Sequence, residues 1–213
     1  MKYTLTSLLF LGVMLLAVAC SDSALNDNSA ATLSSEFATE AEKRAPAPGN
    51  QTIADIVVEA ASAEEDAEFT LLLAALEYTG LTGVFTDGDQ YTVFAPVDQA
   101  FLNLVEALSG DLDSAILENE GPFAAIDDLL GEGAVANVLR YHVVEGRRAA
   151  NSVVPPRNPR NITTLLGATF SVDRNGVITD IAGQVVNFVE DGINISASNG
   201  IIHVIDTVLL PLE

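Results

Sequence analysis

The last strand-like stretch of the chain reads Ser198-Asn199-Gly200-Ile201-Ile202-His203-Val204-Ile205-Asp206-Thr207-Val208-Leu209-Leu210-Pro211. Asn199-Gly200 predicts a turn because both residues tolerate positive φ, and Pro211 ends the run because proline lacks an N–H donor. Side chains alternate between faces along a strand, and both alternating sets are mostly apolar here, so the pattern predicts a central strand buried on both sides. His203 and Asp206 fall on opposite faces. A direct pair between them is therefore not expected, and each needs a partner on another element.

Helical patterns precede that strand. Thr52 is a good N-cap with Asp55 three residues later, which predicts a helix opening at residue 52. Leucines at helical spacing predict a second helix over residues 70–79, which Gly80 is placed to stop. Further helices are expected at 122–130 and 134–140.

Strand patterns follow the helices. The runs 169–172 and 177–179 flank Asp173-Arg174-Asn175-Gly176, which is a hairpin signal. Residues 185–189 and 193–197 read as further strands before the final run. Helices that come first and strands that come later indicate an α+β fold rather than an alternating α/β fold. No internal repeat interrupts residues 51–213, so one folded domain is expected there.

Three segments resemble elements of a known family. The run from Thr92 to Phe101 reads Thr-Val-Phe-Ala-Pro-Val-Asp-Gln-Ala-Phe, and Asp98 is the expected N-cap of the helix that begins there. It resembles the first signature of fasciclin-like domains, which are secreted modules of the adhesion type. Tyr141-His142 resembles the Tyr-His element of that family, and the final strand resembles its second signature. The signature positions are Thr92, Phe94, Pro96, Asp98, Phe101, Asn199, Gly200, His203, Asp206 and Pro211.

The resemblance spans about residues 51–212 and carries expectations about structure. It implies a fasciclin-type β-wedge of about seven strands, with several N-terminal helices packed along its edge. The pattern of the residues by itself indicates only helices first and antiparallel strands later.

The N-terminal residues have the pattern of a signal peptide. Lys2 precedes an apolar run from Leu5 to Val18, which is too short to span a bilayer and fits the central region of a signal peptide. Small residues directly before the lone Cys20 resemble a bacterial lipobox, which implies cleavage after residue 19 and lipid attachment to Cys20. The alternative is an ordinary signal peptide cut after Ala19, which leaves a free thiol.

Residues 20–50 are rich in Ser, Ala, Asn, Asp and Glu and end in alternating Ala and Pro. Such a composition predicts a flexible acidic tether, with a root-mean-square span of roughly 30 Å. The expected location is therefore the bacterial cell envelope, with the chain lipid-anchored in the outer membrane or at the cell surface and facing the periplasm or the exterior.

The charge and the cysteine content argue against several kinds of ligand and against an intramolecular disulfide. The 213-residue chain has 30 acidic and 9 basic residues, giving a formal net charge of -21. Such acidity argues against nucleic-acid binding and against attraction to anionic lipid headgroups. With one cysteine, no intramolecular disulfide is possible.

Catalytic motifs are missing from the sequence. The two histidines are His142 and His203, and no nucleophile elbow, phosphate loop or metal-spaced His/Cys set accompanies them. Asp87-Gly88-Asp89 and Asp111-Leu112-Asp113 lack the spacing of a calcium loop, although calcium binding there stays open. We expect a non-catalytic protein with no cofactor and no metal site.

The leading functional hypothesis is a binding or adhesion module for an unknown protein or polysaccharide at the cell surface. The resemblance attaches partner binding to Tyr141 and His142, for which a purely structural role is the alternative. Arg147, Arg148, Arg157 and Arg160 concentrate positive charge in one short stretch, which favours an acidic partner or weak self-association. A cell-envelope hydrolase or small-ligand carrier, with a pocket near His142 or His203, is the second hypothesis.

Overall fold

The computed structural model describes residues 46–64, 67–85, 89–108, 110 and 121–212. Cys20, the predicted signal peptide and most of the predicted tether lie outside these residues, as do Asp87 and the Asp111–Asp113 pair. Within the described ranges, no helix has the length and the apolar character needed to cross a membrane.

The described strands form two four-stranded sheets. Sheet A has the order β2-β1-β8-β7 and sheet B the order β3-β4-β5-β6. The strands of sheet A are β1 (Tyr91–Pro96), β2 (Val143–Glu145), β7 (Ile195–Ala197) and β8 (Gly200–Ile205). Those of sheet B are β3 (Arg160–Thr163), β4 (Thr169–Val172), β5 (Ile178–Thr179) and β6 (Val185–Val186). The α+β class is confirmed, and the described strands number eight in two sheets rather than about seven in one.

One strand pair departs from the antiparallel pattern expected from the sequence. β1 and β8 run parallel, in a register that places Tyr91 beside Gly200 and Pro96 beside Ile205. The other named pairs are antiparallel. Since the two signature segments contain these two strands, residues more than a hundred positions apart in the chain become direct neighbours at the centre of sheet A.

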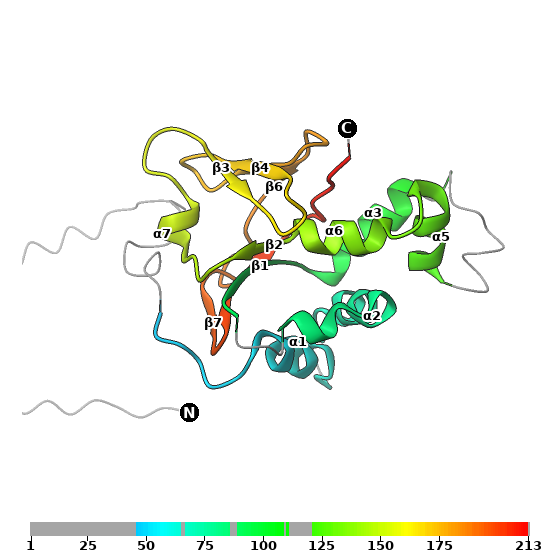
Figure 1. The fold of residues 1–213 in the computed structure, drawn as a ribbon, viewed down its shortest axis with the longest axis horizontal. Helices are drawn as coiled ribbons and strands as arrows, with labels where there is room; N and C mark the ends of the chain where they lie inside the picture. Colours follow the sequence, from blue (N-terminus) through cyan, green and yellow to red (C-terminus); the bar gives the residue numbers. More distant parts are fainter. Residues whose placement is uncertain (1–45, 65–66, 86–88, 109, 111–120, 213) are drawn as a thin grey trace, which may run out of the picture. The chain divides into compact units, whose positions relative to one another are not determined.

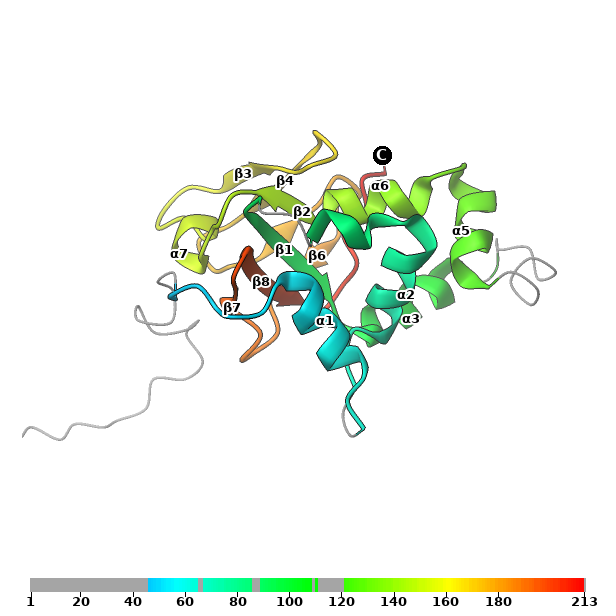
Figure 2. The same cartoon turned by 60° about the horizontal axis from the view of Figure 1, so that its bottom comes forward.

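Sheet A is covered on both faces, as the final strand predicts. Val93 and Ala95 of β1 pack with Ile202 and Val204 of β8 in a core that also contains buried residues of the helices. The alternate side chains, such as those of Phe94 and Ile205, pack with the inner face of sheet B in a second core. Figures 1 and 2 show the longer helices gathered on one side of sheet A, with sheet B and α7 on the other.

The helices predicted at 70–79, 122–130 and 134–140 begin and end within one residue of those bounds, whereas residues 81–85 and 150–153 form short helices that the sequence did not predict. The described helices are α1 (Ile53–Ala61), α2 (Thr70–Thr79), α3 (Asp98–Leu108), α5 (Pro122–Leu130), α6 (Ala134–Tyr141) and α7 (Ala150–Val153), with a 3-10 helix η1 (Leu81–Phe85). Thr52 and Asp55 form the complete capping box of α1. Gly80 adopts the left-handed conformation that ends α2.

Asp98 caps a different helix from the one expected. Its carboxylate accepts hydrogen bonds from the backbone N–H groups of Thr70 (3.1 Å) and Leu71 (2.9 Å), at the start of α2. Helix α2 needs this help, because Phe69 at its N-cap position offers no side-chain acceptor. The signature Asp98 therefore ties α2 to the junction between β1 and α3 rather than capping α3.

The turn before β8 also has a different physical basis. Ser198 and Asn199 form the turn, and neither Asn199 nor Gly200 adopts positive φ. The buried Asn199 side chain instead accepts a hydrogen bond from the Ile53 N–H (2.8 Å) and donates one to the Phe85 carbonyl (2.5 Å). Asn199 thus joins the start of α1 and the end of η1 to sheet A.

Candidate functional site

Tyr141 and His142 lie in the interior. Tyr141 is fully buried, and its hydroxyl donates a hydrogen bond to the Thr169 carbonyl (2.9 Å). His142 is 3% exposed. The His142 Nδ1–H donates to the Val138 carbonyl (2.7 Å), and its Nε2 accepts from the Leu209 N–H (2.9 Å). Neither side chain reaches the surface, so this geometry favours the structural role that was the alternative for the pair.

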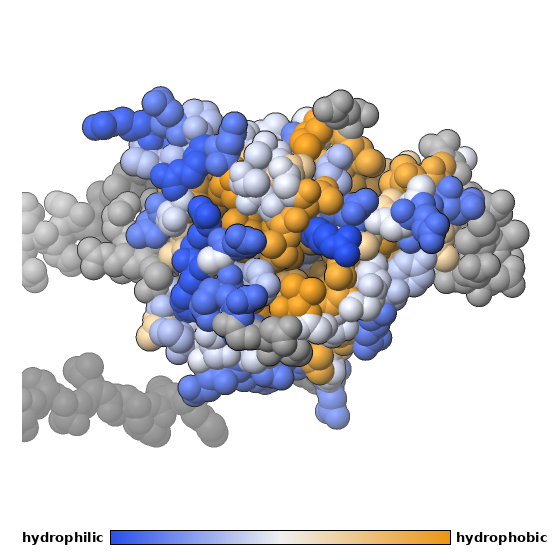
Figure 3. Space-filling model, viewed as in Figure 1, coloured by the Kyte–Doolittle hydropathy of each residue, from blue (hydrophilic) through white to orange (hydrophobic). Residues whose placement is uncertain are grey.

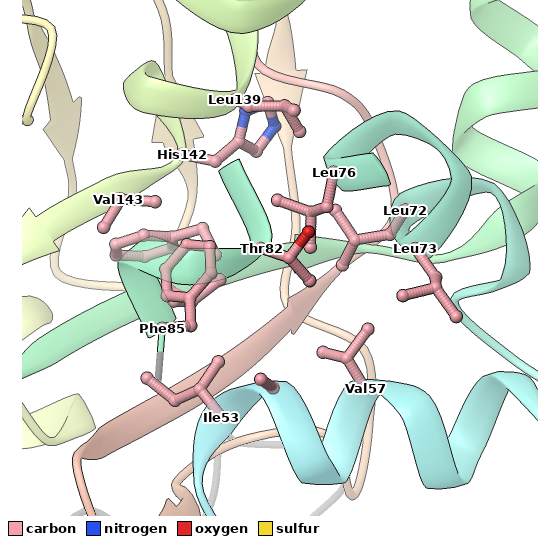
Figure 4. A pocket seen from close by; sticks show the side chains of 13 residues that line it. Ile53, Val57, Leu72, Leu73, Leu76, Thr82, Phe85, Leu139, His142 and Val143 are labelled. Atoms are coloured by element: carbon pink, nitrogen blue, oxygen red, sulfur yellow. The ribbon is translucent and has the colours of Figure 1, made fainter. Parts of the chain in front are cut away.

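Both ring nitrogens of His142 are occupied, which limits its chemistry. Burial lowers the pKa of His142 to about 4, so the ring is neutral at physiological pH. The ring borders an apolar cavity of ≈ 20 Å³, beside Leu139 and Phe85 (Figure 4). A cavity of that size holds about one water molecule. A hydrolase centred on His142 finds no room for a substrate there.

His203, on the other side of sheet A, is also held by hydrogen bonds at both ring nitrogens. Its Nε2–H donates to the Arg148 carbonyl (2.9 Å), its Nδ1 accepts from the Asn194 N–H (3.3 Å), and its ring lies against those of Phe94 and Phe188. Burial lowers the pKa of His203 to about 4. The expected partners on other elements are therefore confirmed for His203.

Asp206 differs from the prediction in position. It lies one residue beyond β8 and is half-buried, so it is not a buried side chain within the strand. Its carboxylate accepts hydrogen bonds from the backbone N–H (2.9 Å) and the side-chain amide (3.0 Å) of Asn187. As expected, it makes no dyad with His203.

Arg147 forms hydrogen bonds both to β7 and to the N-terminal end of the described domain. Its guanidinium donates to the carbonyls of Ala197 (2.8 Å), Gly200 and Pro46 (3.3 Å) and to the Ser196 hydroxyl (2.6 Å). Residues 46–49, the described end of the predicted tether, consequently lie along β7, where the Gly49 N–H also donates to the Ala197 carbonyl (3.3 Å). Arg147 thus has a structural use that the sequence did not predict, since its guanidinium holds residues 46–49 against β7.

We expect Arg147→Ala to release residues 46–49 from β7. The loss of several charge-assisted hydrogen bonds should lower the free energy of unfolding by about 2 kcal/mol. Hydrogen exchange measured by mass spectrometry should show faster exchange in peptides covering residues 46–51 and 195–200. Arg157→Ala serves as the matched control, because Arg157 is exposed and makes no described contact. Unchanged exchange in Arg147→Ala would show that the Arg147 hydrogen bonds contribute nothing.

The remaining predicted arginines separate into different environments. Arg148 is exposed, and its Nε donates to the Glu145 carbonyl (3.2 Å). Arg160 opens β3, and its guanidinium donates to the Ser152 carbonyl of α7. Arg157 is exposed in the loop before it.

The strand register adds Arg174 to this group. Arg160 lies opposite Val172 in the β3–β4 pair, so the loop before β3 and the turn after β4 emerge at the same end of sheet B. Arg157, Arg160 and Arg174 share that end, which we call the cationic end. Among the described residues, none of these three guanidiniums pairs with a carboxylate. Figure 3 shows strongly hydrophilic side chains over the sheet B and α7 side of the molecule.

Charge along the sequence does not reveal Arg174 as a member of this group, because Arg174 joins the other arginines only across the paired strands β3 and β4. A signal was present, since the hairpin predicted at Asp173–Gly176 follows the strand that pairs with β3. The Asp173 carboxylate accepts hydrogen bonds from the N–H groups of Asn175 (2.8 Å) and Val177 (2.9 Å) rather than from a guanidinium.

Comparisons with known proteins identify a family and relatives that are similar to this chain. A protein-family model described as the fasciclin domain matches residues 67–211. The chain is 31% identical over 212 residues to the immunogenic protein MPB70 of Mycobacterium bovis, covering 97% of this chain and 94% of that protein. It is 30% identical over 128 residues to the cell surface glycolipoprotein MPB83 of the same species, covering 59% of this chain and 46% of that one.

The structural comparison agrees with the sequence comparison on the fold. A FAS1 domain pair from the insect cell adhesion molecule fasciclin I superposes with a TM-score of 0.56 at 18% identity, covering 76% of this chain. The match spans 51% of that chain, about half of the domain pair. Taken together with the signature strands β1 and β8 paired at the centre of sheet A, these matches show that the chain belongs to the fasciclin family.

Proposed function

We propose that this protein is a non-catalytic adhesion module of the bacterial cell envelope, held at the membrane by lipid on Cys20. Its family membership and its relation to a cell surface glycolipoprotein support the location. The hydrogen bonds that occupy both nitrogens of each histidine support a role without acid–base chemistry. Adhesion then depends on a surface, and the cationic end is the surface best suited to it.

The observation that carries this proposal is the contrast between the cationic end and the rest of the chain. The formal net charge is -21, yet Arg157, Arg160 and Arg174 gather at one end of sheet B without a carboxylate partner among the described residues. Guanidinium groups bind carboxylates and sulfates in bidentate fashion. The partner that fits is an acidic polysaccharide of the matrix or of a neighbouring cell.

Charge also sets the orientation and the salt dependence of that contact. The Debye length is about 8 Å at physiological ionic strength and about 30 Å at 0.01 M salt. At physiological salt the acidic body is screened from the polymer while the arginines touch it. At very low salt the whole body repels the polymer, and at high salt the direct contacts weaken. Affinity should therefore be greatest at an intermediate salt concentration.

The test is binding of the soluble domain to immobilised alginate, a polyuronate, with uncharged dextran as the reference surface. We expect the double variant Arg157→Glu/Arg174→Glu to lose at least tenfold in affinity, because each exposed cation is replaced by an anion. Each single variant, Arg157→Glu and Arg174→Glu, should already weaken binding. Arg140→Glu is their matched control, since it makes the same charge change as either single variant at an exposed helix position.

Three outcomes would contradict the proposal. One is equal loss in the control variant, which would assign the effect to net charge alone. Another is alginate binding that the double variant leaves intact. A third is self-association of the wild-type chain that disappears in the double variant while alginate does not bind, which would assign the cationic end to contact between copies.

For the proposed lipid anchor, Cys20→Ala should move the protein from the membrane fraction to the soluble fraction.

A further inference from the structure

A groove on the helical side of sheet A has a lining unlike the rest of this acidic chain. It is formed by η1, α2, α6, the start of β2 and Leu165, which follows β3, and its volume is ≈ 180 Å³. Seven of its eight described lining residues are apolar: Leu76, Leu81, Val84, Phe85, Leu139, Val143 and Leu165. Figure 3 shows apolar side chains gathered in a hollow near the centre of the face on which Figure 1 places α6 and β2.

The floor of the groove continues into the interior without a change in polarity. Leu76, Phe85, Leu139 and Val143 also line the small cavity beside His142. In Figure 4 the side chains of Leu72 and Leu76 from α2 and of Ile53 and Val57 from α1 surround the same space as Phe85. A hydrocarbon chain in the groove would therefore meet apolar contacts on its sides and beneath it.

The described lining of the groove contains one polar side chain, which is a cation. Arg140, in the last turn of α6, is the eighth lining residue, and its guanidinium makes no hydrogen bond or ion pair with any described residue. Among the described lining residues there is no carboxylate, although the chain carries 30 acidic residues. In the described part of the chain, every buried side-chain nitrogen and oxygen already has a hydrogen-bond partner. The interior thus offers nothing to a polar ligand such as a sugar.

We propose that this groove binds a free fatty acid, with its hydrocarbon chain along η1 and α6 and its carboxylate on Arg140. The apolar walls supply the affinity, since burial of each methylene from water is favourable. The guanidinium of Arg140 selects an anionic head group, and the described lining holds no acid that would repel that head group. This inference is independent of the adhesion proposal, because it uses a different face and different residues.

The experiment is isothermal titration calorimetry of the folded domain with sodium octanoate and sodium decanoate below their micellar concentrations. Each added methylene should raise affinity by about fourfold until the groove is filled. Decanol tests the need for the anion, and decyltrimethylammonium tests the sign of the charge. We expect decanoate to bind at least tenfold more tightly than either of them.

Two variants assign the site. Arg140→Gln, at an exposed position, should remove the preference for decanoate over decanol and leave the melting temperature unchanged. Val84→Trp should fill the groove and abolish binding of both ligands. Arg157→Gln is the matched control and should bind decanoate normally, while Arg140→Gln should still bind alginate. Failure of one proposal is thereby distinguished from failure of the other.

Three results would overturn this inference. If decanoate does not bind, or binds equally well to Arg140→Gln, the proposed ion pair between the carboxylate and Arg140 does not form. Binding that survives Val84→Trp places the ligand elsewhere. Association with anionic phosphatidylglycerol vesicles in the absence of any binding of monomeric decanoate would identify the groove as a membrane contact instead.

Discussion

Gly200→Ala is expected to destabilise the domain by about 3 kcal/mol or more. Gly200 is buried at the first position of β8, beside Tyr91 of the parallel strand β1. A methyl carbon at this position would overlap the Tyr91 carbonyl oxygen and lie 2.7 Å from the Ile53 side chain. The obstacle is backbone on one side and α1 on the other, so relief requires β8 to move away from β1.

Chemical denaturation followed by circular dichroism would measure this loss. For a domain of this size, about 3 kcal/mol corresponds to a fall in melting temperature of roughly 6–12 °C. Gly83→Ala is the matched control. Gly83 lies in η1 with no atom within 4 Å of the added carbon and without positive φ, so its change should stay below about 1 kcal/mol. A Gly200→Ala protein as stable as the control would show that β1 and β8 tolerate separation.

This position also shows how a correct local prediction rested on the wrong cause. Asn199-Gly200 predicts a turn through positive φ, yet neither residue adopts it. The turn depends on the Asn199 side chain joining α1 and η1, and on the absence of a side chain where β8 meets Tyr91. Both causes involve residues more than a hundred positions away, which local pattern does not reveal.

Elements that depend on nearby residues were predictable from the sequence. The capping box at Thr52 and Asp55 and the glycine stop at Gly80 involve neighbours in the chain. Helix α1 begins where it was predicted to begin, and α2 has both of its predicted bounds. The apolar character of both faces of the final strand correctly predicted burial on both sides of sheet A.

Elements that depend on distant contacts were not predictable in the same way. Asp98 has the local sequence of an N-cap for α3, but the free N–H groups at the start of α2 are the ones that reach it. Arg147 sits in a cluster of basic residues but is used internally, whereas Arg174 joins the cationic end only through strand pairing. The groove at Arg140 combines several elements and leaves no motif in the sequence.

Acidification from pH 7 to pH 5.5 is expected to lower the free energy of unfolding of the domain by roughly 2–3 kcal/mol. Burial lowers the pKa of both His142 and His203 to about 4, from an unfolded value near 6.5. Between these two pKa values the unfolded chain binds two protons that the folded chain does not. The unfolded state is therefore favoured as the pH falls below about 6.5, and the loss continues until the folded pKa near 4 is reached.

The measurement has two parts. Urea unfolding at a series of pH values gives the free energy of unfolding, and NMR of the ring carbons reports the protonation of each histidine in the folded state. Both native rings should remain neutral down to about pH 5. Asn103→His places an exposed imidazole on α3 as an internal reference, and its ring should titrate near pH 6.5.

The acidic surface separates this mechanism from general acid denaturation. Protonation of carboxylates reduces the self-repulsion of a chain with a net charge of -21, so this effect alone should stabilise the fold as the pH falls. A loss of stability above pH 5.5, where most carboxylates are still ionised, consequently points to the histidines. Each ring forms hydrogen bonds with two backbone groups. His142 bonds to Val138 and Leu209, and His203 bonds to Arg148 and Asn194. Protonation of either ring would place an N–H donor against the backbone N–H whose hydrogen bond the ring nitrogen now accepts. Constant stability over this range, or a native ring that titrates near pH 6.5, would contradict the assignment of these histidines as neutral structural links between the strands and the loops that cover them.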